Sequence, residues 1–277
     1  MKLFESPPQT KWNVLNLGAG VQSSCLALMA AKGEITPMPD FAVFADTQDE
    51  PKAVYEWLQY IKGELPFPVY EVSKGKLSDS INVRLMRDGE RLSVESNIPA
   101  FTDGGGMIQR QCTSKYKIQP IISEVRKRCG IKRGQKETTI TQWIGISWDE
   151  MQRMKEARDS WTQHRWPLIE RRMARRDCLD WLKKNGYTIP PRSACIYCPY
   201  KRDSEWRELK MNSPSEFEAA CEIDERYRQN KKIAGRGKDV FIHRSLKPLR
   251  EVDFSSDEDR GQQVWDFQAE CEGMCGL

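Results

Sequence analysis

The first 72 residues alternate short apolar segments with segments of helical pattern, and this alternation constrains the fold more than any other feature. Apolar runs at 13–17, 41–45 and 68–72 predict buried strands, while 23–32 and 51–62 predict helices. A strand–helix–strand–helix–strand order predicts a parallel sheet flanked by helices. We therefore expect an α/β, Rossmann-like fold, followed by a smaller irregular C-terminal region that contains cysteines.

The rest of the chain is less regular. Residues 74–111 are polar and include glycines at 104–106, so a mobile loop over a site is expected there. Another strand is expected at 138–146, and further helices at 114–129, 173–185 and 213–230. These elements predict an α/β domain over 1–170 and a helical and irregular region over 171–277.

Charge and hydropathy limit which ligands the protein can bind and in which compartment it is expected. The chain has 44 Lys and Arg against 40 Asp and Glu, a slightly basic balance that permits a phosphorylated ligand or a nucleic acid. No apolar run approaches the roughly 18 residues that cross a bilayer, and no secretory leader pattern is present. We expect a cytoplasmic protein with no membrane partner. Stable disulfides are uncommon there, so the nine cysteines need another explanation. Some, such as Cys25, Cys129 and Cys221, are expected to be core residues, and the clustered ones are better explained as metal or cluster ligands or as redox thiols.

The turn after the first strand has the chemistry of an anion site. Gly18 and Gly20 let the backbone approach a ligand, and Ser23 and Ser24 place hydroxyl groups at a helix start. The segment is neither a Walker A loop nor GxGxxG. By local pattern alone, a plain tight turn fits as well as a phosphate or sulfate site.

Four segments, in order, extend this interpretation. LGAGVQSSCLAL (17–28) resembles the modified PP-loop of phosphoadenosine-phosphosulfate reductases, which belong to the adenine-nucleotide α-hydrolase superfamily. FADTQDEP (44–51), QCTSKYKIQPI (111–121) and IGISWDEMQR (144–153) resemble the motifs that follow it in that family. The resemblance implies a HUP-type sheet whose first domain binds ATP or phosphoadenosine phosphosulfate, with Mg²⁺ as a candidate companion.

The resemblance also implies which residues contact the nucleotide. The implied set is Gly18, Ala19, Gly20, Gln22, Ser23, Ser24, Asp46, Thr47, Lys117, Gly145 and Arg153, with Lys115 as a catalytic residue. Gly18, Ala19 and Gln22 depart from the usual Ser-Gly-Gly-x-Asp-Ser, which leaves ATP hydrolysis open. Asp46 could instead be a helix N-cap, and both lysines could be solvated.

The cysteines form a second candidate site. Cys195 and Cys198 form a CxxC motif, whose thiolates can hold one metal or cluster, or act as a redox pair. In adenosine-phosphosulfate reductases a Cys-Cys pair stands where Gln111-Cys112 stands here, and together with a later CxxC it holds a [4Fe–4S] cluster. The resemblance therefore implies Cys112, Cys195 and Cys198 as ligands. The fourth position is either an open iron, as in related nucleic-acid-thiolating enzymes, or Cys178, Cys271 or Cys275; zinc is the rival metal.

The tail, with Cys271 and Cys275, resembles the reductase tail whose thiolate attacks sulfur. Both cysteines are expected to be catalytic, with ligation or no role as alternatives. Basic groups at 126–136 and 171–176 suit a nucleic-acid backbone, although solvated surface is the plainer explanation.

The function expected from all this is ATP-dependent sulfur transfer to nucleic acid, with an iron–sulfur cluster. The product would be thiolated tRNA or phosphorothioated DNA, and a cysteine desulfurase or a thioredoxin-type protein would be the donor. A sulfonucleotide reductase and a non-catalytic nucleotide-binding subunit are the alternatives.

Overall fold

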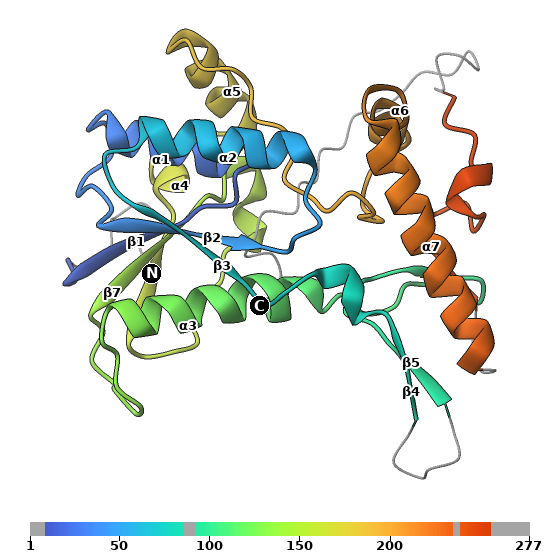
Figure 1. Cartoon of the computed structure of the whole chain (residues 1–277). Coiled ribbons are helices and arrows are strands. Elements are labelled where there is room, and N and C mark those ends of the chain that lie inside the picture. The colour runs from blue at the N-terminus through green and yellow to red at the C-terminus, as the bar shows by residue number, and fades with distance from the viewer. Residues whose placement is uncertain (1–8, 86–91, 235–238, 256–277) are drawn as a thin grey trace.

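The centre of the structure is a parallel sheet. The computed structural model describes residues 9–85, 92–234 and 239–255. Its main sheet has five strands in the order β3-β2-β1-β7-β8, and every pairing is parallel (Figure 1). The strands are β1 (Trp12–Asn16), β2 (Phe41–Asp46), β3 (Val69–Ser73), β7 (Ile140–Ile144) and β8 (Thr162–Arg165). The predicted α/β fold is confirmed.

The apolar pattern of the strands explains their place in the sheet. The central strands β1, β2 and β7 are largely buried, and β2 (FAVFAD) is accordingly a nearly continuous apolar run, while β1 and β7 also bury the polar residues Asn16, Thr141 and Gln142. β8 has the sequence TQHR, which contains no apolar residue, and the sequence did not predict it. It forms because its backbone pairs with β7 at the edge of the sheet.

Helices cover both faces of the sheet (Figure 1). On one face, α1 (Val21–Ala31), α2 (Lys52–Glu64) and α5 (Arg175–Lys184) pack on Leu15, Phe44 and Trp143. On the other, α3 (Gln119–Arg128) packs on Val14, Val43 and Ile140. α3 is preceded by a π-helical turn, η2 (Thr113–Ile118), a form of helix that is frequent at functional sites.

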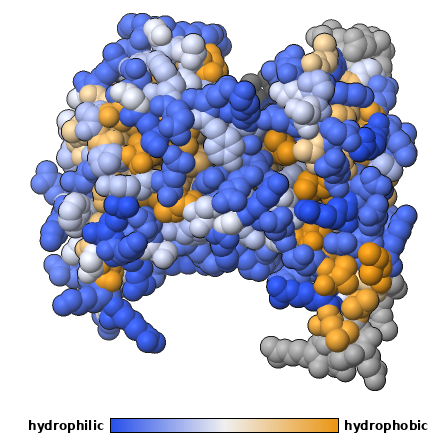
Figure 2. Space-filling model, viewed as in Figure 1, coloured by the Kyte–Doolittle hydropathy of each residue, from blue (hydrophilic) through white to orange (hydrophobic). Residues whose placement is uncertain are grey.

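A second lobe is built from segments that lie far apart in the sequence. It contains η1 (Leu77–Ser80), the hairpin of β4 (Asn82–Leu85) and β5 (Leu92–Glu95), and the pair of β6 (Phe101–Thr102) with β9 (Val240–Phe241). Its helices are α6 (Asp203–Asn212), α7 (Pro214–Ala234) and η4 (Leu249–Glu251). They share one apolar core around Trp206, Tyr197 and Tyr227. The space-filling view shows the surface hollowed between this lobe and the sheet lobe (Figure 2).

The packing of this lobe bears on two expectations. The hydrophobic cores do not divide at residue 170, because 77–108 packs with 195–254 while α5 packs on α1 in the sheet lobe. The described part of 74–111 is also not a loop over the site, since it forms strands that pack on α7. Long-range pairing decides both points, and the pairing of β6 with β9 leaves no local signal in the sequence. Within the described ranges, no helix combines the length and apolar character that a bilayer crossing needs.

Candidate functional site

A pocket lies where three strands of the main sheet end. It encloses about 480 Å³ of non-atom space, part of which is open to solvent. β1, β2 and β7 contribute Asn16, Ala45 and Ile144 to its wall, and η2 contributes Lys117. The chain runs from β1 to β2 on one side and returns to β7 on the other, so the pocket stands at the topological switch point, where open α/β sheets bind ligands.

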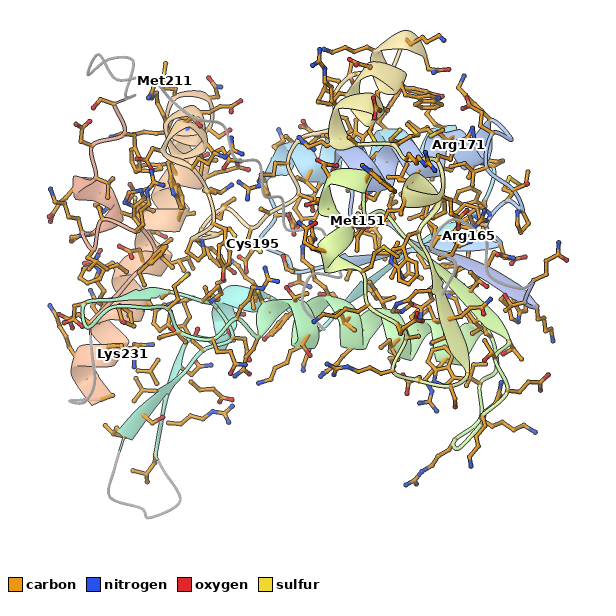
Figure 3. The ribbon with its side chains drawn as sticks, turned by 180° about the vertical axis from the view of Figure 1, so that it is seen from behind. Met151, Arg165, Arg171, Cys195, Met211 and Lys231 are labelled. Atoms are coloured by element: carbon orange, nitrogen blue, oxygen red, sulfur yellow. The ribbon has the colours of Figure 1, made fainter. Side chains whose placement is uncertain are left out.

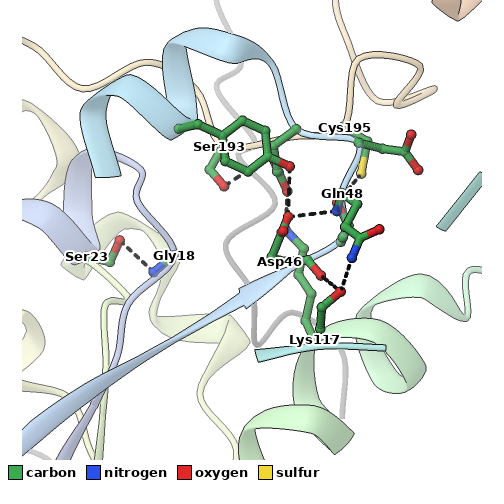
Figure 4. A network of polar contacts seen from close by, with 12 residues as sticks. Gly18, Ser23, Asp46, Gln48, Lys117, Ser193 and Cys195 are labelled. Atoms are coloured by element: carbon green, nitrogen blue, oxygen red, sulfur yellow. Dashed lines mark hydrogen bonds and ion pairs between the residues drawn. The ribbon is translucent and has the colours of Figure 1, made fainter. Parts of the chain in front are cut away.

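The close approach of β7 to α1 shapes this pocket. Gly145 follows β7 and faces Ser23, the third residue of α1. A Cβ atom at Gly145 would lie 2.9 Å from the Ser23 Cα and 3.0 Å from its backbone nitrogen. Only glycine fits without a backbone shift. Ser23 Oγ also accepts a hydrogen bond from the Gly18 backbone N–H at 3.2 Å, which holds the turn (Figure 4).

The pocket contains part of the predicted nucleotide-binding set. Five of its members line the pocket, namely Gly18, Ser23, Lys117, Gly145 and Arg153. Lys117 and Arg153 bring two positive charges beside otherwise mostly apolar walls. This combination suits a phosphorylated ligand with a planar apolar part.

Two other members of the predicted set, Gln22 and Ser24, form hydrogen bonds with neighbouring elements and do not line the pocket. Gln22 is buried, donates to Glu150 Oε2 at 3.2 Å and accepts from Arg175 Nη1 at 3.1 Å. Ser24 Oγ accepts from Trp57 Nε1 at 2.9 Å. Neither side chain lines the pocket. Their hydrogen bonds tie α1 to its neighbours.

The turn residues Ala19 and Gly20 and the motif residues Asp46 and Thr47 also do not line the pocket. Ala19 adopts φ 58°, the left-handed region, and Gly20 begins α1. Asp46 accepts from the Gln48 N–H at 2.7 Å and from Tyr55 Oη at 2.8 Å, so it closes a local turn; the N-cap of α2 is Pro51.

Lys117 is paired with a carboxylate inside the protein. Its Nζ lies 3.1 Å from Glu50 Oε1, and the Glu50 side chain is fully buried. Glu50 Oε2 also accepts from Ser193 Oγ at 3.5 Å. The pair joins residues 67 positions apart and holds the lysine at the pocket. Lys115 lies on the same π-turn, is half-buried and does not line the pocket, so its catalytic role stays a prediction.

Arg153 also has an acidic neighbour, Glu150, with which it forms an ion pair. Burial raises the pKa of Glu150, and the charge of Arg153 opposes this rise. Through Gln22, the same carboxylate is connected to α1 and to Arg175 at the start of α5. Arg175, one of the basic residues at 171–176, therefore takes part in the support of the pocket.

The CxxC segment docks on the polar end of β2. The Ile196 N–H donates to the Asp49 carbonyl at 2.9 Å, and Tyr197 Oη donates to Asp49 Oδ2 at 2.8 Å. Asp49 also accepts from the Ser78 N–H at 2.7 Å. Burial, followed by Cys195 and Asp49, raises the pKa of Tyr197, so its hydroxyl stays a donor. Asp49 thereby joins the CxxC segment, β2 and the second lobe.

Replacement of Tyr197 by phenylalanine should test this anchor. We expect a loss of about 1.5–3 kcal/mol in the free energy of unfolding, because the lost hydrogen bond goes to a charged acceptor. Tyr227→Phe is the matched control, since this buried tyrosine of the same core contacts the neutral Ile98 carbonyl at 3.4 Å. Urea denaturation measures both. Equal losses in the two variants would contradict the assigned role of Asp49.

Cys195 lies between the two lobes, beside the pocket residues (Figures 3 and 4). Its Sγ is 3.3 Å from Thr47 Oγ1, which gives this motif threonine a contact with a thiol. Burial and then Glu50 raise the pKa of Cys195 well above its usual range, while Lys117 and the Thr47 hydrogen bond lower it. Lys117 therefore lies within electrostatic reach of the thiol and also lines the pocket.

The predicted metal ligands do not all come together. Cys112, at the start of η2, packs on the same core as Cys195 and lies close enough to influence the pKa of Tyr197. Cys178 is fully buried in the other core, between α1 and α5, away from these thiols. Cys271 and Cys275 lie outside the described residues.

The fit of a metal or cluster can be judged from these placements. Within 9–85, 92–234 and 239–255, no three His, Cys, Asp or Glu side chains gather closely enough to hold a metal ion. The thiol donors are of the right kind for iron–sulfur or zinc chemistry, but as placed they do not form a complete site. We therefore derive no chemical step through a bound metal.

Sequence reasoning missed the residues that complete the pocket. They are Asn16, Leu17, Phe44, Ala45, Ile121, Ile144 and Ile146. Most lie in or beside the strands, where apolar residues are expected for packing alone. Glu50 was also missed, although it lies within the second motif segment, 44–51. No signal in the local pattern separates a strand residue that lines a pocket from one that fills a core.

Comparison with known proteins adds a resemblance of fold. No family model and no curated protein matches the chain. Among solved structures, it is similar to the U34-tRNA thiolase NcsA from Methanococcus maripaludis, described with its [4Fe-4S] cluster. The sequence identity is 12%, the TM-score is 0.35, and the match covers 83% of this chain and 74% of the thiolase. A TM-score of this size leaves the function to be argued from the chain's own residues.

Proposed function

We propose that the chain is an enzyme that binds an adenine nucleotide in the switch-point pocket and transfers sulfur to a nucleic acid. The observation that carries this proposal is the position of Lys117. Lys117 lines the pocket, and its ion-pair partner Glu50 accepts a hydrogen bond from Ser193, two residues before Cys195. A phosphate bound beside this lysine would lie close to a thiol, which is what a reaction between an activated oxygen and a sulfur nucleophile needs.

The chemistry would proceed in two stages. An oxygen of the nucleic acid attacks the α-phosphorus of ATP, the α–β phosphoanhydride bond breaks, and pyrophosphate leaves. Lys117 and Arg153 would balance the charge that develops on the phosphates. The outer sulfur of a cysteine persulfide, loaded by a cysteine desulfurase, then displaces AMP together with the activated oxygen.

The CxxC motif provides the second thiol that this scheme requires. After the displacement, the product is attached to one cysteine by a disulfide. The thiolate of the other cysteine attacks that cysteine's own sulfur, releases the thiolated nucleic acid and leaves a Cys195–Cys198 disulfide, which a thioredoxin-type dithiol would reduce. Cys195 and Cys198 are close enough to influence each other's ionisation. A cluster held by Cys112, Cys195 and Cys198 remains a prediction.

One assay tests the proposal. The full chain is purified without oxygen, analysed for iron, zinc and sulfide, and incubated with ATP, bulk tRNA or DNA, and a cysteine desulfurase with cysteine. We expect AMP and pyrophosphate together with labelled sulfur in the nucleic acid. Cys195→Ser should abolish sulfur transfer and retain ATP binding, whereas Cys129→Ser, a remote half-buried thiol, should change neither. Sulfite release from phosphoadenosine phosphosulfate would favour a reductase, and binding without turnover would favour a non-catalytic subunit.

A further inference from the structure

One residue that lines the pocket, Asn16, carries a polar atom that lacks a partner. Asn16 is the last residue of β1, lines the pocket and is only 6% exposed. Its Oδ1 atom is shielded from solvent and accepts no hydrogen bond from any described residue. Of the buried unpartnered side-chain atoms in the described part of the chain, it alone belongs to a residue that lines the pocket.

Neighbouring hydrogen bonds fix the orientation of this amide. Thr162 Oγ1 donates to the Ile140 carbonyl, which can only accept, so Thr162 must accept from Gln142 Nε2 at 3.0 Å. This leaves Gln142 Oε1 to accept from Asn16 Nδ2 at 3.4 Å. The Asn16 Oδ1 atom is therefore the free end of the amide, and it is an acceptor.

Native interiors seldom contain an acceptor of this kind. Burial removes its hydrogen bonds to water, and the loss is normally offset by another donor. Here the donor is missing at the one place in the sheet lobe where a ligand would bind. The most direct explanation is that the ligand provides the donor.

We infer that Asn16 determines the ligand specificity of the pocket by accepting a hydrogen bond from an N–H or O–H group of the bound nucleoside. The inference rests on the proposed nucleotide binding. Phosphate oxygens at neutral pH are acceptors, so they cannot be the partner. Two groups of an adenine nucleotide qualify: the exocyclic amine of the base and a hydroxyl of the ribose. Phe44, Ile121 and Ile144 provide apolar walls for the same part of the ligand, while Lys117 and Arg153 meet the phosphates.

The hydrogen bond should discriminate strongly. Binding usually removes water from both partners, and this cost cancels much of the gain. Asn16 Oδ1 is already shielded from bulk solvent in the folded chain, so most of the desolvation cost of the new hydrogen bond falls on the ligand's donor. An analogue without the donor leaves the acceptor unsatisfied and should bind about tenfold more weakly or worse.

Calorimetric titration of the full chain tests this inference. The ligands are ATP, inosine triphosphate, which lacks the exocyclic amine, 2′-deoxy-ATP and 3′-deoxy-ATP, which each lack one hydroxyl, and tripolyphosphate. We expect one of the three analogues to bind the wild-type protein about tenfold more weakly than ATP. That analogue identifies the donor. In Asn16→Ala the same analogue and ATP should bind equally. Ser24→Ala, which removes a buried hydroxyl on α1 that contacts Trp57, should keep the wild-type preference.

The outcomes separate this inference from the proposed function. If ATP and all three analogues bind equally to the wild-type protein, Asn16 has no such role although the pocket binds nucleotide. Persistence of the preference in Asn16→Ala has the same meaning. If neither ATP nor tripolyphosphate binds, the proposed function and the inference both fail. The wild-type series decides the matter even if Asn16→Ala does not fold.

Discussion

Lys117→Met should lower the free energy of unfolding by about 3–5 kcal/mol, because it leaves the buried carboxylate of Glu50 without its counter-charge. The Glu50 side chain is fully buried, and Lys117 Nζ lies 3.1 Å away. Methionine is an unbranched side chain of nearly the same length, and it removes the ammonium charge together with its hydrogen-bond donors. Urea denaturation of the variant and the wild-type protein measures the loss.

The double variant Lys117→Met with Glu50→Gln is the control for this prediction. Replacing both charges of a buried pair by neutral groups of similar size is often nearly neutral for stability. The double variant should therefore recover most of the stability lost in the single variant, while ATP binding stays lost in both. If the double variant is as unstable as Lys117→Met, the loss comes from packing, and the ion pair is not its cause.

Gly145→Ala should have the second-largest effect, a loss of about 1–3 kcal/mol in the free energy of unfolding together with loss of nucleotide binding. The added Cβ would meet the Ser23 backbone at 2.9–3.0 Å, so β7 and α1 would have to move apart. The atoms that the added Cβ meets belong to the backbone of α1, and they cannot move aside as the end of a flexible side chain could. The movement would displace Ser23 and the 18–23 turn, which form one wall of the pocket.

Gly63→Ala is the matched control. Gly63 lies near the end of α2, is exposed and has nothing within 4 Å of an added Cβ. Alanine should stabilise this helix position by about 0.5–1 kcal/mol. Thermal unfolding and ATP titration of both variants complete the comparison. Unchanged ATP affinity in Gly145→Ala would show that the close approach of β7 to α1 does not shape the binding site.

Both variants change residues that line the same pocket. Lys117 lies on η2, and Gly145 follows β7 and approaches Ser23 of α1. Asp49 connects the second lobe to the sheet, because it accepts hydrogen bonds from Tyr197 Oη and the Ser78 N–H next to the end of β2.

The motif residues illustrate how far pattern and structure agree. The predicted Asp46-Thr47 motif does stand at the end of β2. In the structure, however, Asp46 accepts a hydrogen bond from the Gln48 N–H and closes a turn, and the Thr47 hydroxyl contacts the Cys195 thiol. Gln22 likewise occupies its expected place on α1 and turns toward Glu150 and Arg175. A motif fixes where a residue lies along the chain, but packing decides which way its side chain points.

The sequence by itself determined the parallel sheet, the helices on both of its faces and the position of the glycine turn at the switch point. These features depend on local apolar periodicity and on glycine, which a short window of sequence contains. Only the tertiary structure decided that residues 77–108 pack with the C-terminal segments, that Glu50 pairs with Lys117, and that Asn16 Oδ1 stays without a donor. Each of these depends on which distant groups are buried together, and burial is a property of the folded chain as a whole.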